Sequence, residues 1–220
     1  MSVIKAGIAT ILYVLFFELV STWAIIPELL GHTGHFEYYM LIQSSIQAIL
    51  LALIVYVFLK TPIPTFLEKG IMKWYLIAVI SGIAFVFLQT PLNWIYFGLF
   101  NEEHTLVYDF DGFRTLTNVD ILAYVVLIPL SEEIFFREII QKRILKNGSV
   151  FVAILLSALL FASIHAPYEY LFFHNFAPSL HNSFIAFFGG LMSAYLYQRS
   201  GSLGPALVSH CTWNLVVFII

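Results

Sequence analysis

Long apolar runs recur along this chain of 220 residues and limit the folds open to it. A helix needs about 20 mostly apolar residues to cross the hydrocarbon core of a membrane. The composition agrees, because 60% of the residues are hydrophobic and only 10% are charged, whereas a soluble domain carries about 25% charged residues. In lipid the backbone must satisfy its own hydrogen bonds, which favours helices. The sequence therefore predicts an all-α, polytopic transmembrane helical bundle.

The apolar runs divide into about seven candidate spans. Their predicted bounds are 5–27, 39–59, 74–99, 119–142, 150–171, 183–198 and 203–220. The first run is longer than the apolar part of a secretion signal and has no small-residue cleavage site after it, so we expect a retained span. No repeat or linker divides the chain, and we expect a single domain over 1–220.

The distribution of Lys and Arg among the connections predicts the orientation. The second, fourth and sixth connections carry Lys or Arg, the first and fifth carry neither, and the third is acidic with a single Arg114. Because cytoplasmic loops are enriched in Lys and Arg, we expect a multi-pass protein of the cell membrane with its N-terminus in the cytoplasm. The apolar spans make the lipid bilayer an expected partner. Nucleic acid is not an expected partner, because the chain has no basic stripe.

Polar residues inside the predicted spans indicate where function resides, since an ionisable group at mid-membrane costs about 2.5–3.5 kcal/mol. Three spans carry such residues, namely Glu132, Glu133 and Arg137 in the fourth, His165 in the fifth, and His210 and Asn214 in the seventh. Residues four apart share a helix face, so Glu133 and Arg137 can neutralise each other. Glu132 is turned about 100° away from Glu133. The spacing predicts one buried pocket that receives a carboxylate, two imidazoles and an amide.

This set of groups fits hydrolysis by an activated water molecule. A buried carboxylate beside an imidazole can take a proton from water, and an imidazole and an amide can donate hydrogen bonds to a developing oxyanion. Glu132, His165 and His210 are also the ligand types of a catalytic zinc site, so a divalent metal is an open alternative. A further alternative is that these groups satisfy one another as structural hydrogen bonds between helices.

Three motifs at these positions resemble those of the CAAX-protease and bacteriocin-processing (CPBP) family of intramembrane proteases. "EEIFFR" at 132–137 resembles its EExxxR motif, "FASIH" at 161–165 its FxxxH motif, and "HCTWN" at 210–214 its HxxxN motif. The motifs occur in family order, within a motif-bearing core at 119–220. Residues 1–100 carry no such motif. The resemblance implies an intramembrane endopeptidase of glutamic or metallo type.

The resemblance also implies a role for each motif residue. Glu132 would activate the water, and His165 would hold it. Glu133 and Arg137 would support that geometry. The oxyanion site would consist of His210 and Asn214.

The substrate class follows from the same resemblance. The family includes enzymes that trim prenylated CAAX proteins and bacterial members linked to bacteriocin maturation, self-immunity and peptide signalling. We therefore expect a compact bacterial member that cleaves a small peptide or the tail of a membrane-associated protein. Two alternatives are a non-catalytic immunity or partner-binding protein on the same scaffold, and a transporter, since buried Glu, His and Arg also serve in ion pathways. The sequence has no matching pair of broken helices in two halves, which weakens the transporter alternative.

Overall fold

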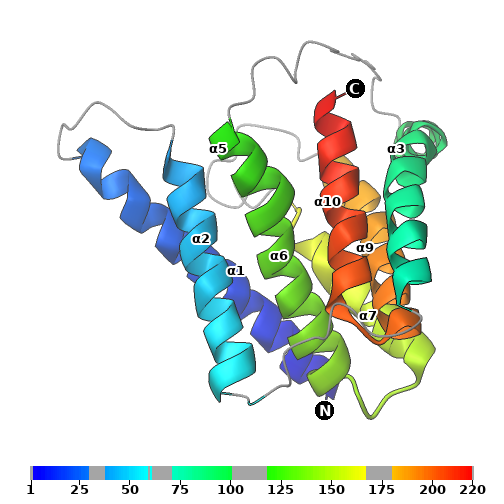
Figure 1. The fold of residues 1–220 in the computed structure, drawn as a ribbon, viewed down its shortest axis with the longest axis horizontal. Helices are drawn as coiled ribbons and strands as arrows, with labels where there is room; N and C mark the ends of the chain where they lie inside the picture. Colours follow the sequence, from blue (N-terminus) through cyan, green and yellow to red (C-terminus); the bar gives the residue numbers. More distant parts are fainter. Residues whose placement is uncertain are drawn as a thin grey trace.

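The computed structural model describes residues 2–29, 38–58, 60, 71–100, 118–166 and 180–219. Helices without any strand make up these ranges, which confirms the all-α prediction for the described part of the chain (Figure 1). In chain order, with η marking π-helical segments, they are α1 (Ser2–Leu29), α2 (Tyr39–Ala52), η2 (Leu53–Phe58), α3 (Met72–Phe100), α5 (Asn118–Asp120), η3 (Ile121–Leu127), α6 (Ile128–Glu133), η4 (Ile134–Ile144), α7 (Val150–Ser163), α9 (His181–Ser200) and α10 (Leu203–Ile219).

The helix bounds follow the predicted spans closely, except at the end of the fifth. That span was predicted over 150–171, but α7 ends at Ser163, a turn follows at 164–166, and 167–171 lies outside the described residues. The sequence gives a physical reason, because Pro167 cannot donate the next helical hydrogen bond and disfavours helical backbone at the residue before it. His165 consequently follows α7 instead of lying within it.

The central helix, from Asn118 to Ile144, is wound differently from the single α-helix that the sequence predicts. Two π-helical segments, η3 and η4, flank the short α6. π-Helical turns are rare and occur frequently at functional sites. Pro129 lies at the start of α6 and has no backbone N–H to donate, which accounts for a change of winding at this point. The two acidic residues of the "EEIFFR" motif, Glu132 and Glu133, are therefore the last residues of α6, where α-helical winding gives way to the π-helical winding of η4.

α3 has the exterior of a helix that contacts lipid. Large apolar side chains project from it, with Leu76, Phe87, Trp94 and Leu99 each between 64% and 70% exposed. Exposed apolar surface of this extent marks contact with a membrane or a partner. Among the described residues, α3 is the one helix long and apolar enough by itself to cross a membrane, and shorter apolar segments lie at Val3–Phe17, Leu41–Val57, Val150–Ser163 and Leu203–Ile219.

The number of spans and the orientation stay predictions. Two of the residues on which the orientation depends, Lys69 and Arg114, lie outside the described residues.

The central helix lies between two groups of helices, α1 and α2 on one side and α10, α9 and α3 on the other (Figure 1). α1 and α2 pack against it on one side and α10 on the other, while α7 contacts its η4 segment. α3 and α9 in turn pack against α10. The three motifs lie in or beside α6, α7 and α10, so this packing brings them to neighbouring positions.

Glycines allow α3, α9 and α10 to approach closely. A Cβ atom on Gly82 of α3 would lie 2.6 Å from the backbone oxygen of Ser209 and 2.8 Å from Cβ of Thr212 in α10. A Cβ atom on Gly189 of α9 would collide with the indole ring of Trp213. Small residues at helix contacts are typical of membrane proteins, where close van der Waals packing holds helices together. The α3–α10 contact therefore has no room for a larger residue at position 82.

Gly82→Ala should destabilise the protein by about 1–3 kcal/mol, because the added methyl group forces α3 and α10 apart. The matched control is Gly98→Ala in the same helix, where a Cβ atom meets nothing within 4 Å. That variant should be as stable as the wild type or slightly more stable. Thermal unfolding of both proteins in detergent checks this, and equal melting temperatures for the two variants would contradict the packing described here.

Candidate functional site

A fully buried ion pair lies at the centre of the motif-bearing helices. Arg137 Nε donates a hydrogen bond to Glu133 Oε2 at 2.8 Å, and both side chains are 0% exposed. The two residues are four apart, as the sequence predicts for pairing along one helix. Two buried charges are tolerable only when each neutralises the other and their remaining hydrogen-bonding groups find partners. The pair therefore depends on the groups around it.

Ser157 of α7 supports the guanidinium of Arg137. Arg137 Nη1 donates to Ser157 Oγ at 2.7 Å, and Ser157 Oγ donates to the backbone oxygen of Phe136 at 3.1 Å. The guanidinium also lies over the ring of Phe161, 5.7 Å from its centroid. The sequence reasoning missed Ser157, although a lone Ser in the middle of an apolar helix was an available signal. It links α7 to the central helix by hydrogen bonds.

His210 of α10 lies between the two adjacent carboxylates. Its Nδ1 donates to Glu133 Oε1 at 3.1 Å, and its Nε2 lies 3.7 Å from Glu132 Oε2. Trp213 stacks on the imidazole with ring centroids 5.4 Å apart, and Phe161 contacts it edge-on at 5.6 Å. The hydrogen bond to Glu133 and the two aromatic rings fix the imidazole plane, so that its Nε2 faces Glu132.

Glu132 is the less enclosed of the two carboxylates. Its side chain is 11% exposed, compared with 0% for Glu133. No hydrogen bond from an arginine or lysine holds it in the described part of the structure, whereas Glu133 accepts one from Arg137. Glu132 is thus the carboxylate that can receive a proton or contact a further molecule.

His165 lies just beyond the end of α7, close enough to Glu132 for an electrostatic interaction. Its Nδ1 forms a hydrogen bond of 2.9 Å with the backbone oxygen of Phe161. A carbonyl oxygen can only accept, so Nδ1 carries the proton, and in a neutral ring Nε2 is an acceptor. The Phe161 ring also contacts the His165 imidazole, with ring centroids 4.8 Å apart. This ring contact, unlike the backbone hydrogen bond, depends on the residue type at position 161.

Asn214 of α10 contacts the backbone of the central helix. Its Nδ2 donates to the backbone oxygen of Tyr124 in η3 at 2.9 Å. In a π-helix that oxygen would bond to the N–H five residues later, but this residue is Pro129, which has none. The Asn214 amide therefore supplies a donor that the proline cannot. One of its two amide hydrogens is used in this way.

The zinc alternative involves Glu132, His165 and His210, of which Glu132 and His210 lie 3.7 Å apart at Oε2 and Nε2. Within the ranges that the structure describes, no three His, Cys, Asp or Glu side chains are placed to hold a metal ion together. His210 directs its Nδ1 to Glu133. A histidine that binds a metal through one ring nitrogen commonly donates its other N–H to a carboxylate in this way. Among the described residues, Glu133 is thus placed to orient the imidazole of His210.

A comparison with known families agrees with the motifs. The family described as "Rce1-like: Type II CAAX prenyl endopeptidase Rce1-like" matches residues 114–216. This stretch contains all three motifs and confirms the resemblance seen in the sequence. No curated protein and no solved structure matches the chain.

Glu133→Gln should destabilise the protein by about 3–5 kcal/mol, because it leaves Arg137 buried without a counter-charge. The double variant Glu133→Gln with Arg137→Met should regain part of this loss, since it removes the unpaired charge as well. Unfolding in detergent as SDS is added measures both. A single variant as stable as the wild type, or a double variant less stable than the single one, would contradict the role of the pair.

Proposed function

We propose that the chain is an intramembrane endopeptidase in which Glu132 is the general base, because residues 114–216 match the Rce1-like family of type II CAAX prenyl endopeptidases. The observation that supports this most directly is the arrangement around His210, with Glu132 facing Nε2 at 3.7 Å and Glu133 holding Nδ1. The proposed substrate is a small peptide or the tail of a membrane-associated protein.

In the proposed reaction, Glu132 and His165 act on the water molecule. The water donates one hydrogen to the Glu132 carboxylate and the other to His165 Nε2, which can accept because Nδ1 donates to Phe161. Removal of the proton by Glu132 makes the water oxygen nucleophilic. The oxygen forms a bond to the scissile carbonyl carbon, and Glu132 then delivers the proton to the amide nitrogen as the C–N bond breaks.

His210 and Asn214 would stabilise the oxyanion that forms in this step. For this role His210 carries a proton on each nitrogen, with Nδ1 bonded to Glu133 and Nε2 facing the reaction. The charges of Glu132, Glu133, Arg137 and His210 then sum to zero, as a site surrounded by hydrocarbon favours. The second amide hydrogen of Asn214, beside the one donated to Tyr124, would complete the donor pair.

The proposed mechanism is metal-free and of the glutamic type. Support comes from the existing hydrogen-bond partners of the imidazoles, since Nδ1 of His165 contacts the Phe161 carbonyl and Nδ1 of His210 contacts Glu133. In a metal-dependent form, Glu132, His165 and His210 would hold a zinc ion that activates the water. Inhibition by 1,10-phenanthroline that zinc reverses would favour that form.

We further propose that 1–220 is one domain of about seven spans with the N-terminus in the cytoplasm of a bacterial cell. Contacts of the N-terminal helix with the motif helix support the single domain. Tyr13 of α1 stacks on Phe135 of η4 with ring centroids 4.3 Å apart, and it contacts Phe136 edge-on at 6.0 Å. The resemblance to bacterial members supports a role in peptide maturation, signalling or bacteriocin self-immunity.

Glu132→Gln should abolish peptide cleavage while the protein stays folded in the membrane, since the amide cannot accept the proton. The measurement is a quantitative comparison of the peptides released by cells with wild type, variant or no copy. The matched control is Glu138→Gln, which removes another buried carboxylate from the same helix, one that contacts Lys142 and Tyr197 instead.

The control should release the wild-type fragments. Near-normal fragments from Glu132→Gln would refute the proposed base. Identical fragments in all strains, with a protective phenotype that persists in Glu132→Gln, would favour a non-catalytic immunity protein.

Asn214→Ala should lower kcat by about 10²- to 10³-fold with little change in KM, because an oxyanion donor acts mainly in the transition state. The variant also loses the bond to Tyr124, so its stability will fall. Ser81→Ala is the matched control, as it removes a different polar contact of α10, that between Ser81 and Ser209 at 3.1 Å. This control should keep its kcat. A fall in kcat for Asn214→Ala no greater than that of the control would show a purely structural role.

A further inference from the structure

Helix α9 carries none of the motif residues, yet its middle contacts the aromatic rings of the candidate site. Two consecutive glycines, Gly189 and Gly190, are both buried in this part of the helix. Gly189 faces Trp213 of α10, and Gly190 faces Phe161 of α7. The two glycines therefore lie where α9 meets the two helices that carry the second and third motifs.

Gly189 lies directly against the indole ring of Trp213. A Cβ atom at this position would meet Cζ3 and Cη2 of the ring, the latter at 2.8 Å, whereas carbon atoms normally approach to about 3.5–4.0 Å. The indole stacks on the His210 imidazole with ring centroids 5.4 Å apart, and it contacts Phe85 of α3 edge-on at 4.8 Å. With neighbours from three helices, the indole has little room to move without changing its stack on His210.

Gly190 lies in a similar way against the ring of Phe161. A Cβ atom here would lie 3.0 Å from Cδ1 of Phe161 and 3.2 Å from the backbone Cα of Ala158. The Phe161 ring contacts both imidazoles, that of His165 with ring centroids 4.8 Å apart and that of His210 at 5.6 Å. Each glycine is therefore separated from an imidazole of the site by one aromatic ring.

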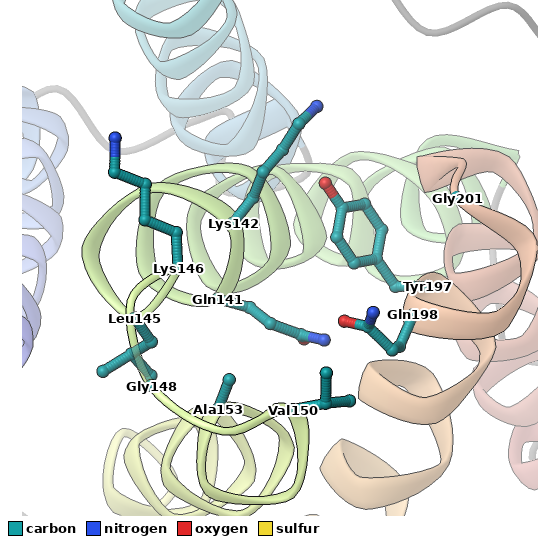
Figure 2. Close-up of a pocket in the computed structure, with 10 residues that line it drawn as sticks. All are labelled: Gln141, Lys142, Leu145, Lys146, Gly148, Val150, Ala153, Tyr197, Gln198 and Gly201. Carbon is teal, nitrogen blue, oxygen red and sulfur yellow. The ribbon is translucent and has the colours of Figure 1, made fainter.

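α9 is bonded to the central helix, so it cannot readily move back from these rings. Tyr197 donates to Glu138 at 3.0 Å, and the backbone oxygen of Ala194 accepts from Gln141 Nε2 at 3.1 Å. Figure 2 shows Tyr197 and Gln141 at a pocket of about 300 Å³ near this end of α9. A side chain added in the middle of the helix would therefore displace the aromatic rings in preference to the helix.

We propose that Gly189 and Gly190 are positioning residues for the two imidazoles of the site. The absence of side chains lets each aromatic ring rest against the backbone of α9, and the rings hold the imidazoles beside Glu132. A misplacement of reacting groups by about 1 Å can cost about 10²-fold in rate. This role rests on the proposed function, since it needs both histidines to act in peptide hydrolysis.

The direct test is NMR of the full chain in detergent with ¹³C-labelled histidine rings. The chain has 7 histidines, and the signals of His165 and His210 are assigned by their loss in His165→Gln and His210→Gln. Because an aromatic ring shifts the resonances of a group packed on it, these signals report where each imidazole lies. Gly189→Ala should move mainly the His210 signal, and Gly190→Ala should move both. An unchanged His210 signal in Gly189→Ala would overturn the proposal.

A conservative change should rescue the glycine variant. Release of the wild-type-specific peptides, per amount of folded protein, should fall about 10- to 100-fold in Gly189→Ala. Trp213→Phe makes room for the added methyl group, because a phenyl ring has no atoms in place of Cζ3 and Cη2 but can still stack on His210. The double variant should return to the release and the His210 signal of Trp213→Phe alone. A double variant no more active than Gly189→Ala would contradict the positioning role.

The matched control is Ala194→Val, which adds bulk to the same helix one turn beyond Gly190, at a residue that is 0% exposed. It should lower the melting temperature but leave the histidine signals and the peptide release unchanged. An effect on the His210 signal equal to that of Gly189→Ala would indicate a general disturbance of α9 and overturn the proposal.

Two further outcomes keep the proposal testable. If Gly189→Ala fails to fold, Trp213→Leu replaces it, since leucine removes the stack on His210 without added bulk. Its release should fall well below that of Trp213→Phe, and equal release would overturn the role of the stacked ring. If the wild type releases no peptides of its own, the proposed hydrolysis fails, whereas the histidine signals still decide whether the glycines position the imidazoles.

Discussion

The buried ion pair between Glu133 and Arg137 is the interaction on which the candidate site depends. It joins three helices, because Arg137 also bonds to Ser157 of α7 and Glu133 also accepts from His210 of α10. A charge in this environment is stable only with its partners in place. The pair therefore neutralises one of two adjacent carboxylates and orients the imidazole against the other, Glu132.

The winding of the central helix is a second constraint on the site. η3 and η4 flank the short α6, which carries both acidic residues of the first motif. Pro129 has no N–H with which to form a π-helical bond to the backbone oxygen of Tyr124, and Asn214 of α10 donates to this oxygen. The side-chain amide of Asn214 is thus hydrogen-bonded to the backbone of the helix that carries Glu132. A rigid connection of this kind favours a site whose polar groups are fixed before substrate binds.

The buried site around Glu133 satisfies most of its polar groups within the protein. Glu133 accepts from both Arg137 and His210, and Arg137 also donates to Ser157. Arg137 Nη2 is an exception, since this buried atom has no hydrogen-bond partner among the described residues. An arrangement in which the protein itself supplies most partners fits a buried reaction site.

The sequence by itself determined the all-α class, the bounds of most helices and the pairing of Glu133 with Arg137. These features are local, since they follow from apolar run length and from a spacing of four along one helix. The tertiary structure alone decided the role of Ser157, the contact of His210 with both carboxylates and the bond from Asn214 to Tyr124. Each of these depends on how separate helices pack against one another, and spacing along a single helix does not specify that packing.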